Sequence, residues 1–410
     1  MPEFFSFFVI LLTAVLFSQL FGRMHVPWVV ALILGGITIG PFGLDLFQPD
    51  DTISFLAQIG LVFLMFMAGL ETRLSDIVGV RSKILTLALL NGLIPASVGI
   101  TIALYFGYTW PTALLLGIIF MSSAIALLIP SFQSLGIIRS AFGKLIIGAT
   151  ILIDAISLLL LSVFLQIQAG APVGGIVLFY PFLAVVLAGL AWIIPRVRRS
   201  FGEYAEEHDL FEKELRFTLL ILIGLVVFFE FVGLHAIIAG FFAGLILARS
   251  VESRITKAKL HALSYGIFIP IFFVVIGGTV DLSVFADTKG ALAIITTVVI
   301  GLIIAKLGSG LLAGRLLGYK LGESAFIGAS SLPQLSTSLA VAFLGFGAGL
   351  LDQTLLTAIV ALAITTSLTA PFLVNLLARF VAGQQVAIHD IEAREAEAAQ
   401  KKVDPPTSDT

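Results

Sequence analysis

Long apolar segments, separated by short polar stretches, recur along almost the whole chain. About 20 apolar residues suffice for a helix to cross a bilayer, and thirteen segments meet that length approximately. They lie at about residues 4–21, 26–41, 53–70, 84–106, 111–131, 145–167, 173–195, 215–232, 234–249, 262–280, 290–314, 322–344 and 352–380. The pattern predicts an all-α polytopic membrane protein with about thirteen transmembrane helices.

The composition supports this prediction. The chain is 59% hydrophobic and 12% charged, whereas soluble domains carry roughly 25% charged residues. A net charge of −2 provides no basic field, so we expect the lipid bilayer, and no nucleic acid, as a partner. The chain contains no cysteine, which excludes disulfides and thiolate metal sites.

The basic residues predict the orientation of the chain. If the thirteen segments cross the membrane in turn, 21 of the 23 Lys and Arg residues lie on one side. Lys289 lies on the other side, and Lys306 lies inside a segment. Because cytoplasmic loops are rich in Lys and Arg, we expect the N-terminus outside and the C-terminus in the cytoplasm of a prokaryotic plasma membrane.

An internal repeat is visible at an offset of 208 residues. The aligned pieces are residues 31–40 with 239–248, Gly69 with Gly277, Leu74–Ser75 with Leu282–Ser283, and Ser122–Ser123 with Ser330–Ser331. Six segments plus one linking segment place the two halves in opposite orientations, as in many secondary transporters. We therefore predict a membrane domain at 1–381, made of repeat one (1–170), a linking helix (171–199) and repeat two (212–381).

Two polar pieces lie outside these segments. A charged stretch at 203–215, EYAEEHDLFEKEL, includes His208, and we interpret it as a solvated helix rather than a pH sensor. Residues 382–410 form a short tail rich in Ala, Glu and Lys. We predict that this tail is cytoplasmic and partly disordered.

Asp154 is the one charged residue in the apolar segment 145–167. A charged side chain at the bilayer centre costs about 2.5–3.5 kcal/mol on insertion scales, so intramembrane acids are usually functional. Thr150 and Ser157 are four residues before and three after it, on the same face of a helix. The three side chains could bind a proton or a cation through oxygen ligands. Alternatively, Asp154 is a packed residue that the two hydroxyls satisfy.

Lys306 lies near the middle of the eleventh segment. It is either a counter-charge or a competitor for Asp154, or a lysine that reaches the interface along its own stem. The fourth segment contains Asn91 and Pro95, which can kink it.

The fifth and twelfth segments have polar residues near their centres. These are Ser122 and Ser123 in the fifth, and Ser330, Ser331, Pro333 and Gln334 in the twelfth. Proline and hydroxyl clusters at this depth predict two discontinuous helices that line a cavity. Their half-helix ends would present carbonyls to a cation and amides to an anion. Alternatively, the small residues pack helices closely.

Enzyme functions find little support. The chain lacks the HExxH zinc motif, has one intramembrane aspartate, and keeps its five histidines away from the segment centres. We expect no catalytic residue and no cofactor.

Seven motifs occur in an order that resembles the monovalent cation:proton antiporter-2 family. They are GGITIGPFGL, GLVFLMFMAGLE, MSSAIAL, the segment with Asp154, EFVGLHAIIAGFFAGL, PIFFVVIGGTVDL and AKLGSGLLAGRLLG. The resemblance implies a homodimer in which segments one to three and eight to ten form a dimerisation panel. It further implies that segments four to six and eleven to thirteen form a moving core with two crossed broken helices.

The resemblance also assigns roles to single residues. Asp154 matches the essential transport aspartate, Thr150 a hydroxyl ligand, and Lys306 a lysine in the penultimate core segment. Ser122 and Ser123 match the unwound part of the first broken helix. Two positions depart from the family. Ile153 stands where relatives carry Asp, Asn or Gln, and Gln334–Ser336 follows Pro333 where many relatives have an Arg-Gly-Glu-like stretch.

The favoured hypothesis is a secondary transporter that exchanges Na⁺ or K⁺ for protons on Asp154 by an elevator-like movement. One carboxylate predicts 1:1, electroneutral exchange. Three other functions stay open: a cation channel on the same scaffold, a non-transporting ion or pH sensor, and, with less support, a sodium:organic-anion symporter.

Overall fold

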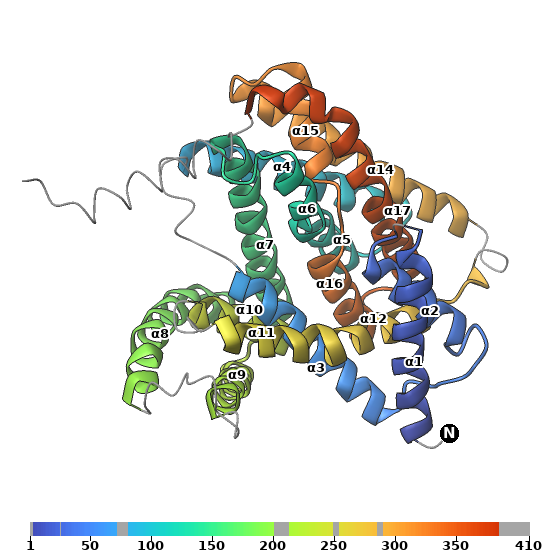
Figure 1. Cartoon of the computed structure of the whole chain (residues 1–410), viewed down its shortest axis with the longest axis vertical. Coiled ribbons are helices and arrows are strands. Elements are labelled where there is room, and N and C mark those ends of the chain that lie inside the picture. Colours follow the sequence, from blue (N-terminus) through green and yellow to red (C-terminus); the bar gives the residue numbers. More distant parts are fainter. Residues whose placement is uncertain are drawn as a thin grey trace, which may run out of the picture.

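The computed structural model describes residues 3–24, 26–71, 81–200, 213–248, 254–284 and 290–384. These residues form helices and connecting turns, and contain no strand (Figure 1). Eight helices among them are long and apolar enough to cross a membrane, and four shorter helices are apolar. The prediction of an all-α membrane protein is confirmed. His208, Leu74, Ser75 and the tail from residue 385 lie outside the described residues.

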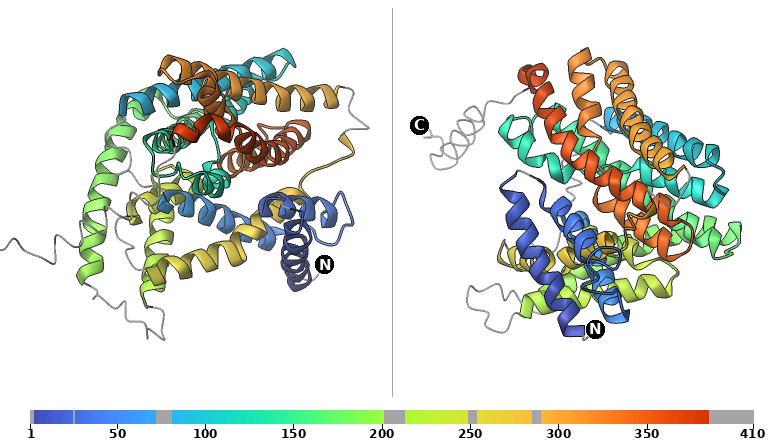
Figure 2. Two further views of the ribbon diagram at one scale, coloured as in Figure 1. Left: turned by 45° about the horizontal axis from the view of Figure 1, so that its top comes forward. Right: turned by 90° about the vertical axis from the view of Figure 1, so that its right-hand side faces the viewer.

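The helices form two packed groups (Figure 2). The first group consists of α1 (Glu3–Gly22), α2 (Trp28–Ile39), α3 (Asp51–Glu71), α9 (Lys213–Phe231), α10 (Ala236–Leu247), α11 (Arg254–Leu263) and α12 (Ile269–Gly278). A π-helical turn at Ser264–Phe268 joins α11 to α12. Within this group α3 packs along α10 and α2 along α12.

The second group holds the interrupted helices. It consists of α4 (Arg81–Tyr105), α5 (Trp110–Met121), α6 (Ile129–Ser134), α7 (Ala141–Gln168), α14 (Ala291–Leu316), α15 (Leu321–Ser330), α16 (Ser336–Gly347) and α17 (Gln353–Leu377). Few close backbone approaches join the two groups, mainly α16 on α3, α17 on α2 and α7 on α10. Apolar side chains fill the space between the groups, as where Phe272 on α12 meets Phe343 on α16. Helix α8 (Val173–Ser200) lies at the edge of the molecule and is mostly exposed (Figure 2).

Glycines allow the close packing inside the first group. A Cβ atom on Gly277 would lie 2.2 Å from the backbone oxygen of Ile33, and one on Gly69 would lie 2.1 Å from that of Phe241. Both separations are far below van der Waals contact, so a larger side chain cannot fit without moving a backbone. Small residues of this kind let membrane helices approach closely.

Two helices of the second group break in the middle. Helix α5 ends at Met121, and an extended stretch and the 3-10 turn Ile125–Leu128 precede α6. Helix α15 ends at Ser330, and five residues separate it from α16, which begins at Ser336. Pro333 lies in that gap and cannot donate a backbone hydrogen bond to continue the helix.

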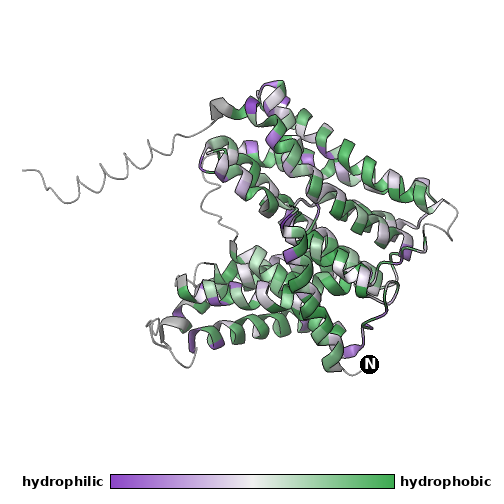
Figure 3. Cartoon of the chain, turned by 45° about the vertical axis from the view of Figure 1, so that its right-hand side comes forward, coloured by the Kyte–Doolittle hydropathy of each residue, from purple (hydrophilic) through white to green (hydrophobic). Residues whose placement is uncertain are grey.

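Hydrophobic residues cover most of the helices in both groups, and hydrophilic residues gather mainly at helix ends and turns (Figure 3). The polar side chains at the two breaks are therefore exceptions, and they position the candidate site.

Candidate ion-binding site

The two interrupted segments hydrogen-bond to each other directly. The N–H of Ala124 donates to the carbonyl of Pro333 at 2.7 Å. The hydroxyl of Ser123 donates to the carbonyl of Ser331 at 2.9 Å, and the amide Nε2 of Gln334 donates to the carbonyl of Ser122 at 2.5 Å. The structure thus brings four predicted site residues together, namely Ser122, Ser123, Ser331 and Gln334.

Gln334 is fully buried, and its backbone N–H, side-chain nitrogen and side-chain oxygen each take part in hydrogen bonds. Its backbone N–H donates to the hydroxyl of Thr366 on α17 at 3.1 Å. Its side-chain oxygen accepts hydrogen bonds from the hydroxyls of Ser338 and Ser122, which lie 2.7 Å from each other. A buried amide that is satisfied in this way fixes its neighbours, so Gln334 joins α16 and α17 to the first break.

Asp154 lies on α7, is partly buried, and faces the first break. Its Oδ1 atom accepts a hydrogen bond from the backbone N–H of Ser123 at 3.2 Å. That amide is available because the helix is interrupted there. Within the described part of the chain, Oδ2 accepts no hydrogen bond. This second oxygen is therefore free to take a proton or a cation.

Thr150 and Ser157 are buried, but their hydroxyls bond to the backbone of their own helix. Thr150 donates to the carbonyl of Ile146 at 3.0 Å, and Ser157 donates to the backbone carbonyl of Asp154 at 2.8 Å. Neither hydroxyl bonds to the Asp154 carboxylate. The alternative in which these hydroxyls satisfy a merely packed aspartate is therefore wrong for this conformation.

Lys306 is completely buried on α14. Its ammonium donates to the carbonyl of Met121 at 2.8 Å, to the hydroxyl of Ser123 at 2.8 Å, and to the carbonyl of Asn91 at 3.2 Å. The alternative in which Lys306 extends its side chain to the membrane surface is therefore wrong, because the ammonium is held by these three acceptors inside the protein. No direct ion pair joins Lys306 to Asp154 among the described residues, although the two charges attract each other.

The first break binds both the ammonium of Lys306 and the carboxylate of Asp154. The carbonyl of Met121, at the end of α5, holds the ammonium of Lys306. Two residues later, the amide of Ser123 holds the carboxylate of Asp154. This agrees with the polarity of helix ends, where free carbonyls attract cations and free amides attract anions.

Several contributing residues were not predicted as site residues. Ser338 and Thr366 bond to Gln334, and Ser309 donates to the side-chain oxygen of Asn91 at 2.7 Å. Each is a polar residue in an apolar segment, and that is the signal that could have identified it. Ser330, which was predicted, ends α15, and its buried hydroxyl has no hydrogen-bond partner in the described part of the chain.

The donor set suits a transient monovalent cation better than a resident metal. The described residues contain no group of three His, Cys, Asp or Glu side chains that could hold a metal ion. The two helix breaks, at residues 122–124 and 331–335, meet at a place that we call the crossing. It offers one carboxylate, with serine hydroxyls and backbone carbonyls around it. Hard monovalent cations bind to oxygen ligands of this kind.

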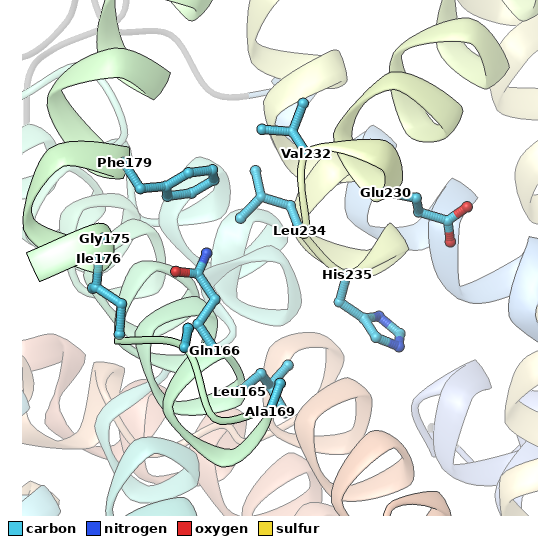
Figure 4. Close-up of a pocket in the computed structure, with 12 residues that line it drawn as sticks. Leu165, Gln166, Ala169, Gly175, Ile176, Phe179, Glu230, Val232, Leu234 and His235 are labelled. Atoms are coloured by element: carbon cyan, nitrogen blue, oxygen red, sulfur yellow. The ribbon is translucent and has the colours of Figure 1, made fainter. Parts of the chain in front are cut away.

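A cavity of about 630 Å³ lies elsewhere, at the α7–α8 and α9–α10 turns, and no predicted site residue lines it. Figure 4 shows Phe179, Gln166 and Leu234 around the cavity, with Glu230 pointing away from them. His235 caps α10 by accepting a hydrogen bond from the N–H of Ile237 at 3.5 Å. The side chain of His235 is exposed.

Comparisons with known proteins place this site in context. A family model described as "Sodium/hydrogen exchanger, transmembrane" matches residues 7–379. A protein of Methanocaldococcus jannaschii named "Probable Na(+)/H(+) antiporter 3" is 30% identical over 91% of this chain and 96% of its own length. A Bacillus cereus protein named "Na(+)/H(+)-K(+) antiporter GerN" is 27% identical over 90% of this chain and 94% of its own length.

A solved structure shares the fold. The structure of the sodium proton antiporter MjNhaP1 from Methanocaldococcus jannaschii at pH 8 matches with a TM-score of 0.64 and 16% identity. The match covers 92% of this chain and 94% of that chain. The relatives are named as antiporters, and antiporters are transporters rather than enzymes.

Proposed function

Because the chain belongs to the family of transmembrane sodium/hydrogen exchangers, we propose that it exchanges a monovalent cation, Na⁺ or K⁺, for protons. The observation that carries the proposal is the carboxylate of Asp154. The Ser123 amide holds one of its oxygens, and the other oxygen is unpaired in the described structure. One oxygen positions the group and the second binds the transported species.

In this mechanism a proton and a cation compete for the same oxygen. When Asp154 is ionised, the cation binds to Oδ2 and takes further oxygen ligands from the hydroxyls of Thr150 and Ser157 and from the crossing. When Asp154 is protonated, the cation leaves. If the site faces the two sides of the membrane in turn, an inward cation gradient drives protons out, and the reverse gradient drives the reverse flux.

The proposed exchange is electroneutral. Ile153, directly before Asp154, is buried in an apolar cluster with Ile146 and Ala149 and contributes no second carboxylate. One carboxylate carries either one proton or one monovalent cation, so the two loaded forms have the same charge. Lys306, with its ammonium fixed by three acceptors, serves as a constant counter-charge.

Alternating access would come from movement of the second helix group against the first. The small number of close backbone approaches between the groups supports this elevator-like model. The crossing lies wholly within the second group, so the site would travel with it. By the family resemblance, the first group would form the dimer interface of a homodimer.

The proposed architecture has thirteen membrane-spanning segments: two inverted six-helix repeats joined by a linking helix, with the N-terminus outside and the C-terminus in the cytoplasm. Paired contacts support the repeats. The approach of Gly277 to Ile33 recurs at Gly69 and Phe241 with each position shifted by 208 residues. Ser123 and Ser331, which bond across the crossing, are also 208 residues apart.

The test is proton flux in proteoliposomes that contain the full chain. An internal pH dye reports flux as Na⁺, K⁺ or Li⁺ is titrated outside. We expect saturable, cation-dependent proton flux whose rate is the same with and without an imposed membrane potential. Cation flux that does not saturate and moves no protons would establish a channel, and cation binding without flux would establish a sensor. A voltage-dependent rate would contradict electroneutrality.

A further inference from the structure

Pro95 lies inside helix α4, and its position has a direct consequence for Lys306. Proline has no backbone N–H, so the carbonyl four residues earlier lacks its normal helical donor. That carbonyl belongs to Asn91, and it accepts a hydrogen bond from the ammonium of Lys306 at 3.2 Å. Because Pro95 and Asn91 are both buried, water does not compensate for the missing donor.

The ammonium of Lys306 has all of its donors in use. An ammonium group carries three N–H bonds, and three oxygens accept them: the carbonyls of Asn91 and Met121 and the hydroxyl of Ser123. Both carbonyls are available because a helix is disturbed, by Pro95 in α4 and by the end of α5 at Met121. No N–H remains to point at Asp154.

A carboxylate is nevertheless close. The same residue, Ser123, contacts Lys306 through its hydroxyl and Asp154 through its amide. If one acceptor of the ammonium were lost, an N–H would be free to turn to the carboxylate. A charge-assisted hydrogen bond of that kind is stronger than one to a neutral carbonyl, and it would occupy the oxygens that the transported cation needs.

We propose that Pro95 is a positioning residue: by freeing the Asn91 carbonyl, it holds the ammonium of Lys306 away from Asp154 and so keeps the carboxylate available to the cation. The inference rests on the proposed exchange function. It concerns a residue that contacts neither the cation nor the carboxylate.

The direct test is Pro95→Ala, which restores an N–H at position 95 and returns the Asn91 carbonyl to the helix. We expect the KM for Na⁺ (or for K⁺, if K⁺ is the better substrate) to rise about tenfold, with kcat changed less than threefold. A competing ammonium weakens cation binding, whereas general damage to the fold lowers the amount of active protein and leaves KM unchanged. The KM-against-kcat split therefore separates positioning from structure.

Pro371→Ala is the matched control. Pro371 also lies inside a long helix of the second group, α17, and the carbonyl that it frees belongs to Ser367, far along the chain from the three acceptors of Lys306. We expect its KM to stay within twofold of wild type.

A second variant keeps the test decisive if Pro95→Ala does not fold. Ser123→Ala removes another acceptor of the same ammonium and keeps the amide that holds Asp154. It should raise the KM in the same direction, and it should raise the Na⁺ concentration that gives half-maximal thermal stabilisation of the purified protein.

The outcomes distinguish this inference from the proposed function. Wild-type protein without cation-coupled proton flux would contradict the proposed function itself. Wild-type flux together with a KM that Pro95→Ala and Ser123→Ala leave unchanged, or lower, would overturn the role of Pro95 alone.

Discussion

Glycines bring helices together in both helix groups, and the second group adds buried polar bonds at its helix breaks. In the first group, Gly244 on α10 meets Phe66 on α3. In the second group, a Cβ on Gly310 of α14 would lie 2.3 Å from Gly328 of α15. There, buried polar side chains also bond to backbone atoms that helix breaks leave free. Close backbone packing favours a rigid group of helices. The hydrogen-bonded crossing can position charges, and each of its side-chain hydrogen bonds depends on a polar group that a single substitution can remove.

The largest expected effect on folding comes from a glycine of the first group. In Gly244→Ala the new Cβ would lie 2.1 Å from the backbone oxygen of Phe66, so two helices must separate. Overpacking costs about 1–3 kcal/mol and sometimes more, and we expect the upper end here because the obstacle is backbone. Size-exclusion chromatography in detergent should show aggregation or low yield.

Gly224→Ala is the matched control for that prediction. It lies on α9 in the same group, and a Cβ there would meet nothing within 4 Å. A monodisperse, wild-type-like Gly244→Ala protein would contradict the packing account.

An intermediate effect is expected from Gln334→Ala in the second group. The change leaves the Ser122 carbonyl and the hydroxyls of Ser122 and Ser338 without the amide that bonds to them. Unsatisfied buried groups cost about 1–3 kcal/mol each, so the crossing should loosen while the first group stays folded. We expect exchange to fall about tenfold in proteoliposomes at normal protein yield.

Gln48→Ala serves as the control, because Gln48 is exposed and lies in the connection between α2 and α3, outside the crossing. If Gln334→Ala transported like Gln48→Ala, the hydrogen-bonded crossing would not be what positions the site.

The smallest effect is expected at a turn of the second group. The Tyr108 hydroxyl donates to Asp352 at 3.0 Å, and Asp352 in turn caps α17. Burial, together with the nearby Asp352 charge, raises the pKa of Tyr108 above its ordinary value. The phenol therefore keeps its proton through the alkaline range, and the bond weakens only when the pH rises through that raised pKa. Tyr108→Phe should destabilise by about 0.5–1 kcal/mol, since the site is half exposed.

Thermal unfolding in detergent at pH 7 and pH 9 measures this prediction. The same small loss is expected at both values. A loss that disappeared at pH 9 would show that the phenol has already ionised and would contradict the role given to the hydrogen bond.

The polar side chains of the second group could be predicted from the sequence, but their backbone partners could not. Asp154, Lys306, Ser122, Ser123 and Gln334 were identifiable because each is polar within an apolar segment. Two of the three acceptors of the Lys306 ammonium were not identifiable, because they are backbone carbonyls, which every residue has. Pro95 was predicted to kink its helix, but the donor that bonds to the freed Asn91 carbonyl depends on where α14 lies. Likewise, the 208-residue offset aligned Gly69 with Gly277 without indicating that they pack on α10 and α2.

The central claim is that Asp154 binds the cation and the proton in turn. It is tested most directly by Asp154→Asn, which keeps the size and the Ser123 contact of the side chain but removes its charge. Glu230→Gln, an equivalent change at a carboxylate away from the site, is the matched control. Cation-driven proton flux should fall at least 100-fold in Asp154→Asn, at wild-type yield and monodispersity, and stay near wild type in Glu230→Gln. Wild-type flux in Asp154→Asn would contradict the account.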